Sequence, residues 1–231
     1  MFSMKYKAVC FDIDGTLYPE SEVVSLLSGF VKRHPLLNLK YSKMRLKFRE
    51  LQETDSEIFK SDYSFREREA AILLGKNTGY EKIKRTAQML ENKYYRNLKL
   101  AYTGLKQETE PLRVLNYLKE KNVITGVLTD WPLFDKLERL GLKQFMDFEI
   151  TSEETGFLKP SAKCFNYMLD RIGFRAQDVL FVGDSYPKDI SGAHRAGMDA
   201  VLINNTEQGN FSDALKVFSN FKEFENWILS L

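Results

Sequence analysis

Near the amino terminus the chain reads Val9-Cys10-Phe11-Asp12-Ile13-Asp14-Gly15-Thr16-Leu17. The apolar run from Ala8 to Phe11 is typical of a strand that is buried on both faces of a parallel sheet. Asp12 and Asp14 then stand two residues apart, and residues at this spacing point to the same side of an extended backbone. We therefore predict that two carboxylates leave the carboxyl end of this strand facing one space.

Two carboxylates this close repel each other, so they need a cation, a shared proton or separate chemical roles. Gly15 follows them, at a point where a chain leaving a strand often needs unusual dihedral angles. Aspartate and glycine are also common turn formers, so this stretch by itself is equally compatible with a turn that ends a strand. The rest of the chain distinguishes the two interpretations.

Three further motifs follow in the order Leu128-Thr129-Asp130, Gly156-Phe157-Leu158-Lys159-Pro160 and Phe181-Val182-Gly183-Asp184-Ser185-Tyr186-Pro187-Lys188-Asp189. The first and the third stand at the ends of apolar, strand-like runs, whereas Lys159 lies in a loop before a predicted helix. With these four signals in this order, the chain resembles the haloacid dehalogenase-like superfamily of hydrolases. The resemblance covers residues 5–17 and 104–205 and says little about the segment between them.

The segment between these regions has helical apolar spacing throughout. Helices are predicted at residues 21–32, 39–51, 64–74 and 80–95. Ser64 and Glu67 form a capping-box pattern at the start of the third of these helices. No strand is predicted in this segment, so we expect an all-helical cap at residues 18–102, inserted directly after the first strand.

Strands and helices alternate in the rest of the chain. Strands are predicted at residues 123–128, 148–151, 179–182 and 200–203, with an edge strand at 215–218. Helices are predicted at residues 110–121, 133–140, 161–172, 190–196 and 221–229. This alternation predicts an α/β fold, in which residues 1–17 and 103–231 form a doubly wound, parallel, Rossmann-like core. Such sheets bind ligands at the carboxyl ends of their strands, where Asp12, Asp14, Thr129 and Asp184 fall.

The aspartates offer hard oxygen ligands with no histidine or thiolate nearby in the sequence, which favours Mg²⁺ over zinc. The resemblance implies that Asp12 is a nucleophile that forms an aspartyl phosphate. It implies that Asp14 is the general acid that protonates the leaving group and the base that then activates water. It also implies that Mg²⁺ is held by the Asp12 carboxylate, the Asp14 backbone carbonyl and Asp184. Asp189 would orient waters or partners from outside that set.

The resemblance places a second group of residues around the phosphate. Thr129 would donate its hydroxyl, and Asp130 its backbone N–H, to phosphoryl oxygens, and Lys159 would supply a positive charge beside Asp12. Relatives often carry an amide where this chain has Asp130, and Trp131-Pro132 also departs from the family pattern.

Together these features predict a Mg²⁺-dependent phosphatase that acts on a small phosphorylated metabolite. A phosphotransferase, such as a sugar-phosphate mutase, would use the same residues but exclude water when its cap closes. A dehalogenase is disfavoured, because that branch of the family lacks an acid at the position of Asp14.

Composition limits the partners and the compartment. The formal net charge of +2 over 231 residues gives no argument for a nucleic-acid partner. The two cysteines, Cys10 and Cys164, form no CxxC motif, and Cys10 is expected to be a small buried residue. With no signal-like or membrane-spanning run, these features predict a cytoplasmic protein without a membrane partner. The oligomeric state is left open.

The predicted helix at residues 39–51 is crowded with positive charge, at Lys40, Lys43, Arg45, Lys47 and Arg49. These side chains either steer an anionic substrate or form a solvated helix face. If they line the substrate pocket, replacing Lys43, Arg45, Lys47 or Arg49 with alanine should change the ranking of substrates.

Overall fold

The computed structural model describes residues 4–54, 57–75, 77–204 and 208–231. Its centre is a six-stranded sheet in the order β3-β2-β1-β4-β5-β6, and every neighbouring pair is parallel. The strands are β1 (Ala8–Phe11), β2 (Ile124–Thr129), β3 (Phe148–Thr151), β4 (Val179–Gly183), β5 (Asp199–Leu202) and β6 (Lys216–Val217). The predicted parallel α/β core is confirmed, and the short edge strand lies where it was expected.

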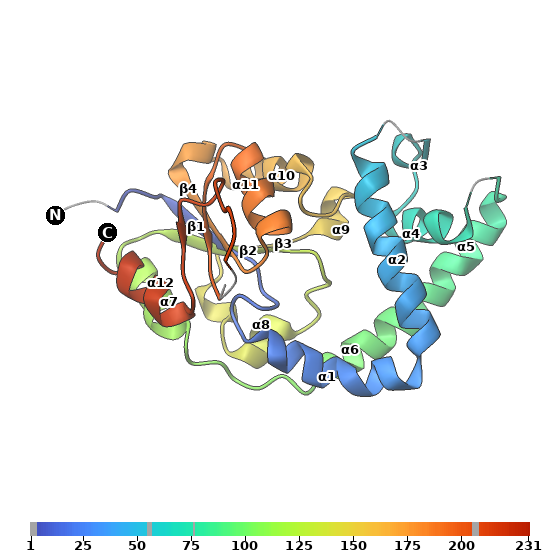
Figure 1. Cartoon of the computed structure of the whole chain (residues 1–231), viewed down its shortest axis with the longest axis horizontal. Helices are drawn as coiled ribbons and strands as arrows, with labels where there is room; N and C mark the ends of the chain where they lie inside the picture. Colours follow the sequence, from blue (N-terminus) through green and yellow to red (C-terminus); the bar gives the residue numbers. More distant parts are fainter. Residues whose placement is uncertain (1–3, 55–56, 76, 205–207) are drawn as a thin grey trace.

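Strand β1 lies in the middle of the sheet and is buried along its whole length. Val9 and Phe11 belong to one apolar core, whereas Ala8 and Cys10 belong to the other. Because successive residues of a strand point to opposite faces, one continuous apolar run supplies both cores. The first core includes residues of α7 (Leu112–Glu120) and α12 (Phe221–Ile228), and the second includes residues of α10 (Ala162–Ile172) and α11 (Ser191–Arg195). The sheet is therefore covered on both faces (Figure 1).

Between β1 and α7 the chain forms only helices within the described residues of 20–102. They are α1 (Glu20–Arg33), α2 (Pro35–Gln52), α3 (Glu57–Lys60), α4 (Phe65–Leu74), α5 (Tyr80–Met89), the π-helical turn η1 (Leu90–Tyr95) and α6 (Arg96–Tyr102). We call α1 to α6 the helical segment. It lies to one side of the sheet, with α1 and α2 towards the sheet-bearing part (Figure 1).

Two helix boundaries in this segment differ from the prediction. Helix α2 begins at Pro35 and not at residue 39. A backbone N–H at the first helical position has no partner within the helix, so proline, which lacks this group, is well suited there. The last helix does not end at Tyr95, since η1 joins α5 to α6 and carries the helical path to Tyr102. The predicted capping box of Ser64 and Glu67 is present at the start of α4.

Short elements complete the part around the sheet: α8 (Lys136–Leu140), η2 (Lys143–Phe145), α9 (Ser152–Thr155), η3 (Ala176–Asp178) and η4 (Tyr186–Ile190). The helix predicted from residue 133 begins only at Lys136, because Phe134 has a left-handed φ of 47°. The helix predicted at residues 190–196 is preceded by the π-helical turn η4, which carries Asp189. Among the described residues, no helix is both long and apolar enough to cross a bilayer.

Candidate active site

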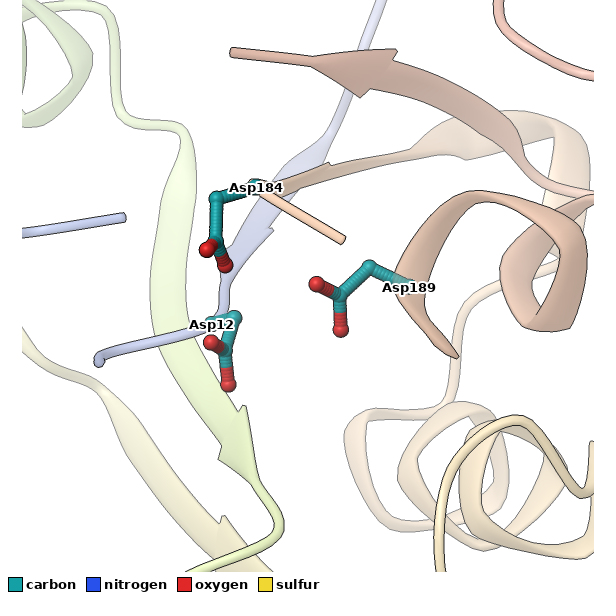
Figure 2. Close-up of side chains that lie close together, drawn as sticks. All are labelled: Asp12, Asp184 and Asp189. Carbon is teal, nitrogen blue, oxygen red and sulfur yellow. The ribbon is translucent and has the colours of Figure 1, made fainter. Parts of the chain in front are cut away.

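Three carboxylates converge at the carboxyl ends of β1 and β4 (Figure 2). Asp12 follows β1, Asp184 follows β4, and Asp189 lies in η4. Each offers one oxygen, and these oxygens all lie within 4.8 Å of one another. Parallel pairing of β1 with β4, in which the Asp12 N–H donates to the carbonyl oxygen of Val182, brings the first two together. The predicted meeting of Asp12 and Asp184 at one sheet edge is therefore present in the structure.

Gly15 lets the loop after β1 approach Asp184 closely. Its φ is +90°, and a Cβ atom built on it would lie 2.3 Å from Asp184 Oδ2. The dihedral angle strains any side chain at this position, and an added Cβ would also displace the Asp184 carboxylate. The neighbouring Thr16 donates its hydroxyl to Asp184 Oδ1 over 3.3 Å. The glycine of the opening motif thus brings the two acidic motifs into contact.

Lys159 is buried among the acids of the cluster. Its Nζ donates to Asp12 Oδ1 over 2.7 Å, to Asp189 Oδ1 over 2.6 Å and to the carbonyl oxygen of Leu128 over 3.2 Å. Although burial opposes the charged form, Asp12 and Asp189 raise the pKa of Lys159 well above its usual value. The structure therefore holds an ammonium group against the carboxylate predicted to be the nucleophile.

One ammonium does not balance the acids that surround it. Burial raises the pKa of Asp12 to about 8, and Asp189 and Asp184 add to the increase while Lys159 opposes it. Burial and Asp189 also raise the pKa of Asp184 to about 6. The ionised forms of these acids are therefore destabilised, and an additional cation among their oxygens would stabilise them.

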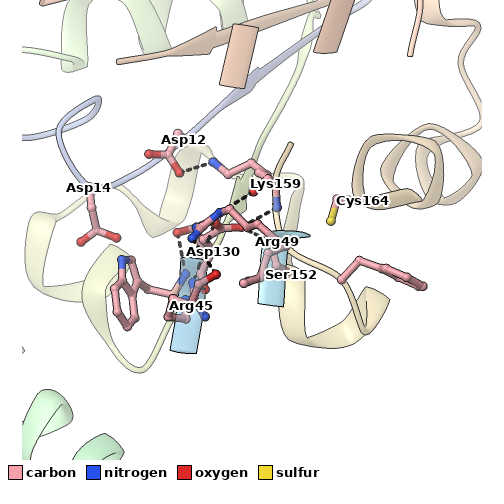
Figure 3. A network of polar contacts seen from close by, with 12 residues as sticks. Asp12, Asp14, Arg45, Arg49, Asp130, Ser152, Lys159 and Cys164 are labelled. Atoms are coloured by element: carbon pink, nitrogen blue, oxygen red, sulfur yellow. Dashed lines mark hydrogen bonds and ion pairs between the residues drawn. The ribbon is translucent and has the colours of Figure 1, made fainter. Parts of the chain in front are cut away.

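Asp14 faces a different set of partners from those of Asp12. Lys136 Nζ donates to both of its carboxylate oxygens, over 2.9 and 2.7 Å, and the Tyr18 hydroxyl also donates to it. Figure 3 shows the Asp14 side chain apart from the bonded pair of Asp12 and Lys159. An ammonium group can only donate, so both carboxylate oxygens of Asp14 accept hydrogen bonds here. The two neighbouring acids of the motif are thus held in separate environments, as separate roles would require.

Lys136 and Tyr18 were not singled out from the sequence. Lys136 is fully buried, and burial lowers its pKa while Asp14 opposes the change. The available signal was its position, because Lys136 stands four residues before the buried Leu140 and so shares a face of α8 with it. A charged residue on such a face needs a buried partner, and here that partner is Asp14.

We expect Lys136→Met to slow hydrolysis of alkyl phosphates by about 100-fold, the usual lower range for positioned acid–base catalysis. Asp14 would lose the partner that orients it, and alkoxide leaving groups depend most on a proton donor. Rates on an alkyl and an aryl phosphate should be compared with those of the exposed-lysine variant Lys163→Met. An equal loss on both esters would contradict a link between Lys136 and proton transfer.

Thr129 and Asp130 lie at the end of β2, as predicted. The Thr129 hydroxyl oxygen accepts from the Trp131 N–H over 3.3 Å. The Asp130 carboxylate accepts from the Ser152 hydroxyl over 2.6 Å and from Arg49 Nη2 over 2.6 Å. Despite burial, Arg45 and Arg49 hold the pKa of Asp130 well below its usual range. Its carboxylate is thus occupied by protein donors, and a phosphate contact at this position depends on the backbone N–H.

The basic helix α2 divides into two faces. Lys43 and Lys47 are exposed. Arg45 is buried and its Nη2 donates to the Asp130 carbonyl oxygen over 3.0 Å, while Arg49 bonds to the carboxylate of Asp130. The interpretation as a solvated face therefore fits Lys43 and Lys47 and is wrong for Arg45 and Arg49. The reason is helical spacing, which places the two arginines on the same side of α2 as its buried residues.

Comparison with known proteins agrees with this geometry. The family described as haloacid dehalogenase-like hydrolase matches residues 6–197 of the chain. The chain belongs to the haloacid dehalogenase-like hydrolases. It is 32% identical to glyceraldehyde 3-phosphate phosphatase of Methanocaldococcus jannaschii, over 90% of this chain and 91% of that relative. It is 34% identical to the protein of the same name from Methanothermobacter thermautotrophicus, over 86% of each chain.

Solved structures show the same fold. YfnB of Bacillus subtilis, in a magnesium-bound crystal form described as revealing interdomain movement, superposes with a TM-score of 0.65. That match has 23% identity and covers 98% of this chain and 100% of the other. The family match and the two phosphatase relatives confirm the predicted superfamily and the predicted class of enzyme, a hydrolase.

Proposed function

We propose that this hydrolase is a Mg²⁺-dependent phosphatase that releases phosphate from a small phosphorylated metabolite through an aspartyl-phosphate intermediate. The observation that carries the proposal is the buried Lys159 ammonium, 2.7 Å from Asp12, beside a cluster of three carboxylates. An anionic phosphate ester is repelled by a bare carboxylate nucleophile, and this arrangement reduces that repulsion. The relatives named glyceraldehyde 3-phosphate phosphatase support a small phosphorylated substrate.

The residues at the cluster fit Mg²⁺. Asp12 and Asp184 supply carboxylate oxygens, and the backbone carbonyl of Asp14 follows Asp12 by two residues in the same loop. Hard oxygen donors of this kind are those Mg²⁺ prefers, and a magnesium-bound relative with the same fold supports the assignment. Asp189 is not a metal ligand in this proposal, because its two oxygens already accept hydrogen bonds from Lys159 Nζ and from the Ser185 N–H. When bound, the ion would neutralise charge on the transferring phosphoryl group.

In the proposed reaction, a carboxylate oxygen of Asp12 attacks phosphorus, and the bond from phosphorus to the leaving oxygen breaks. A proton carried by Asp14 moves to that leaving oxygen. Water then attacks phosphorus and gives its proton to Asp14, and the phosphorus–Asp12 bond breaks to release inorganic phosphate. The hydrogen bonds from Lys136 to both Asp14 oxygens support this role, because they orient the carboxyl group that would carry the proton.

Space for the leaving group lies beside the site. A cavity of about 510 Å³ is lined by Gly15, Thr16 and Tyr18 on one side and by Asp184 and Ser185 on another. We assign the helical segment, within residues 18–102, to a cap that covers the site, because Tyr18 and the start of α1 border this cavity. A cytoplasmic location fits Cys10 and Cys164, which are both buried and unpaired. Nothing in the net charge of +2 suggests a nucleic-acid partner.

A metal titration tests this function. Phosphate release from an aryl phosphate should be undetectable in excess chelator and should return when Mg²⁺ is added back, because the acid cluster binds hard cations. Phosphate released should equal phenol released, which separates hydrolysis from transfer of the phosphoryl group to a second acceptor. Full activity in excess chelator would exclude the metal assignment.

A further inference from the structure

The loop at residues 156–159, which carries Lys159, has four backbone polar groups bonded to side chains of the helical segment. Gln52 makes two of these bonds: its Nε2 donates to the Leu158 carbonyl oxygen over 2.8 Å, and its Oε1 accepts from the Leu158 N–H over 2.7 Å. Arg49 Nε donates to the Lys159 carbonyl oxygen over 2.8 Å. Arg68 Nη1 donates to the Gly156 carbonyl oxygen, also over 2.8 Å. Helices α2 and α4 therefore hold the main chain of this loop.

Asp130 completes the contact from the side of the sheet. Its Oδ1 accepts from the Lys159 N–H over 2.9 Å, and its Oδ2 accepts from Arg49 Nη2 over 2.6 Å (Figure 3). Both backbone polar groups of Lys159 are thus held, one by Asp130 and one by Arg49, and these two side chains are bonded to each other. This closed ring of hydrogen bonds restricts the backbone at Lys159 both from the helical segment and from the end of β2.

Two of the residues that depart from the family pattern, Asp130 and Trp131, meet α2. Arg45 lies with its guanidinium 4.6 Å from the centre of the Trp131 ring and donates to the Asp130 carbonyl oxygen. A buried carboxylate needs a compensating charge, and Arg49 and Arg45 supply it from the helical segment. Asp130 is therefore matched to the arginines of α2 and not to a substrate anion.

We propose that α2 is a positioning element for Lys159: docking of Gln52 and Arg49 on the loop sets the Lys159 ammonium between Asp12 and Asp189. The inference rests on the proposed function, in which this ammonium faces the phosphate. Gln52 and Arg49 act through the Lys159 ammonium, which faces the phosphate group that all phosphate-ester substrates share. Their loss therefore lowers turnover of all substrates by a similar factor, whereas loss of a pocket residue changes the ranking of substrates.

Two variants and one matched control test this inference. Gln52→Met keeps the side-chain volume and removes both bonds to Leu158, and Arg49→Lys keeps one donor near the loop. Lys47→Ala, on the exposed face of the same helix, is the control. We expect Gln52→Met to lower kcat about 10-fold to 100-fold on an aryl phosphate and on two metabolite esters alike, the loss typical of a misplacement near 1 Å. Arg49→Lys should lose less, and Lys47→Ala should match the parent.

Binding of inorganic phosphate in the presence of Mg²⁺, measured by calorimetry, gives a second readout. Gln52→Met should weaken this binding in the parent background and leave it unchanged in a Lys159→Met background, because the effect passes through Lys159. Parent-like kcat and phosphate affinity in folded Gln52→Met and Arg49→Lys would overturn the inference, and so would a changed substrate ranking. A parent protein that hydrolyses no ester would instead overturn the proposed function, and this inference with it.

Discussion

Asp12→Asn is expected to lower turnover of an aryl phosphate by at least about 10⁴-fold, the scale of loss on removing a catalytic nucleophile. The amide is a poor nucleophile and a weak ligand for a hard cation, so the substitution removes two proposed roles together. Initial rates with saturating Mg²⁺ measure the loss, and Asp62→Asn, at an exposed position, is the matched control. A phosphorylated aspartate trapped at any residue other than Asp12 would contradict the nucleophile assignment.

The fold of this variant should remain intact. The raised pKa of Asp12 means that the folded state binds the carboxyl proton more tightly than the unfolded state does. As pH rises from 3.8, the ordinary pKa of Asp12, towards about 8, ionisation of Asp12 lowers the free energy of unfolding of the metal-free protein. Above that range, in chelator, Asp12→Asn should melt no lower than the parent. A large decrease in melting temperature would show that ionised Asp12 contributes to the fold.

Lys159→Met is expected to lower turnover about 10³-fold, the scale found when one preorganised donor to a developing charge is removed. It also leaves Asp12 and Asp189 facing each other without the ammonium between them. Breaking a buried ion pair in this way costs about 3–5 kcal/mol of unfolding free energy. Mg²⁺ should restore part of this stability, because in the proposed function it binds the folded state through the carboxylate of Asp12.

Chemical denaturation with and without Mg²⁺ measures this effect, and Lys163→Met, at an exposed lysine, is the control. Lys159→Arg separates charge from position, since it keeps the charge on a bulkier group. A folded Lys159→Met enzyme with parent-like kcat would show that the ammonium has no part in the chemistry. Unchanged stability of Lys159→Met would show that Asp12 and Asp189 do not repel each other in the folded state.

The amino-acid sequence by itself determined the parallel core and most of the residues that meet at its edge. The apolar run of β1 is complete enough to require burial on both faces, and the alternation of strands with helices then defines the sheet. Because parallel strands end at one edge, Asp12, Thr129 and Asp184 come together as a consequence of strand order alone. Local signals also sufficed for the capping box of α4 and for the helices that the structure describes between Glu20 and Tyr102.

Only the tertiary structure decided which side chains surround these residues. Asp12 and Asp14 share a motif, yet Lys159 bonds to the first and Lys136 to the second, because each lysine arrives from a distant element. Four basic residues of α2 look alike in sequence, yet Arg45 and Arg49 meet Asp130 while Lys43 and Lys47 stay exposed. Pairings of this kind depend on how helices and loops pack across more than 80 residues of chain. Local propensity and spacing describe a residue's own element, and they carry no information on which distant charge that element will face.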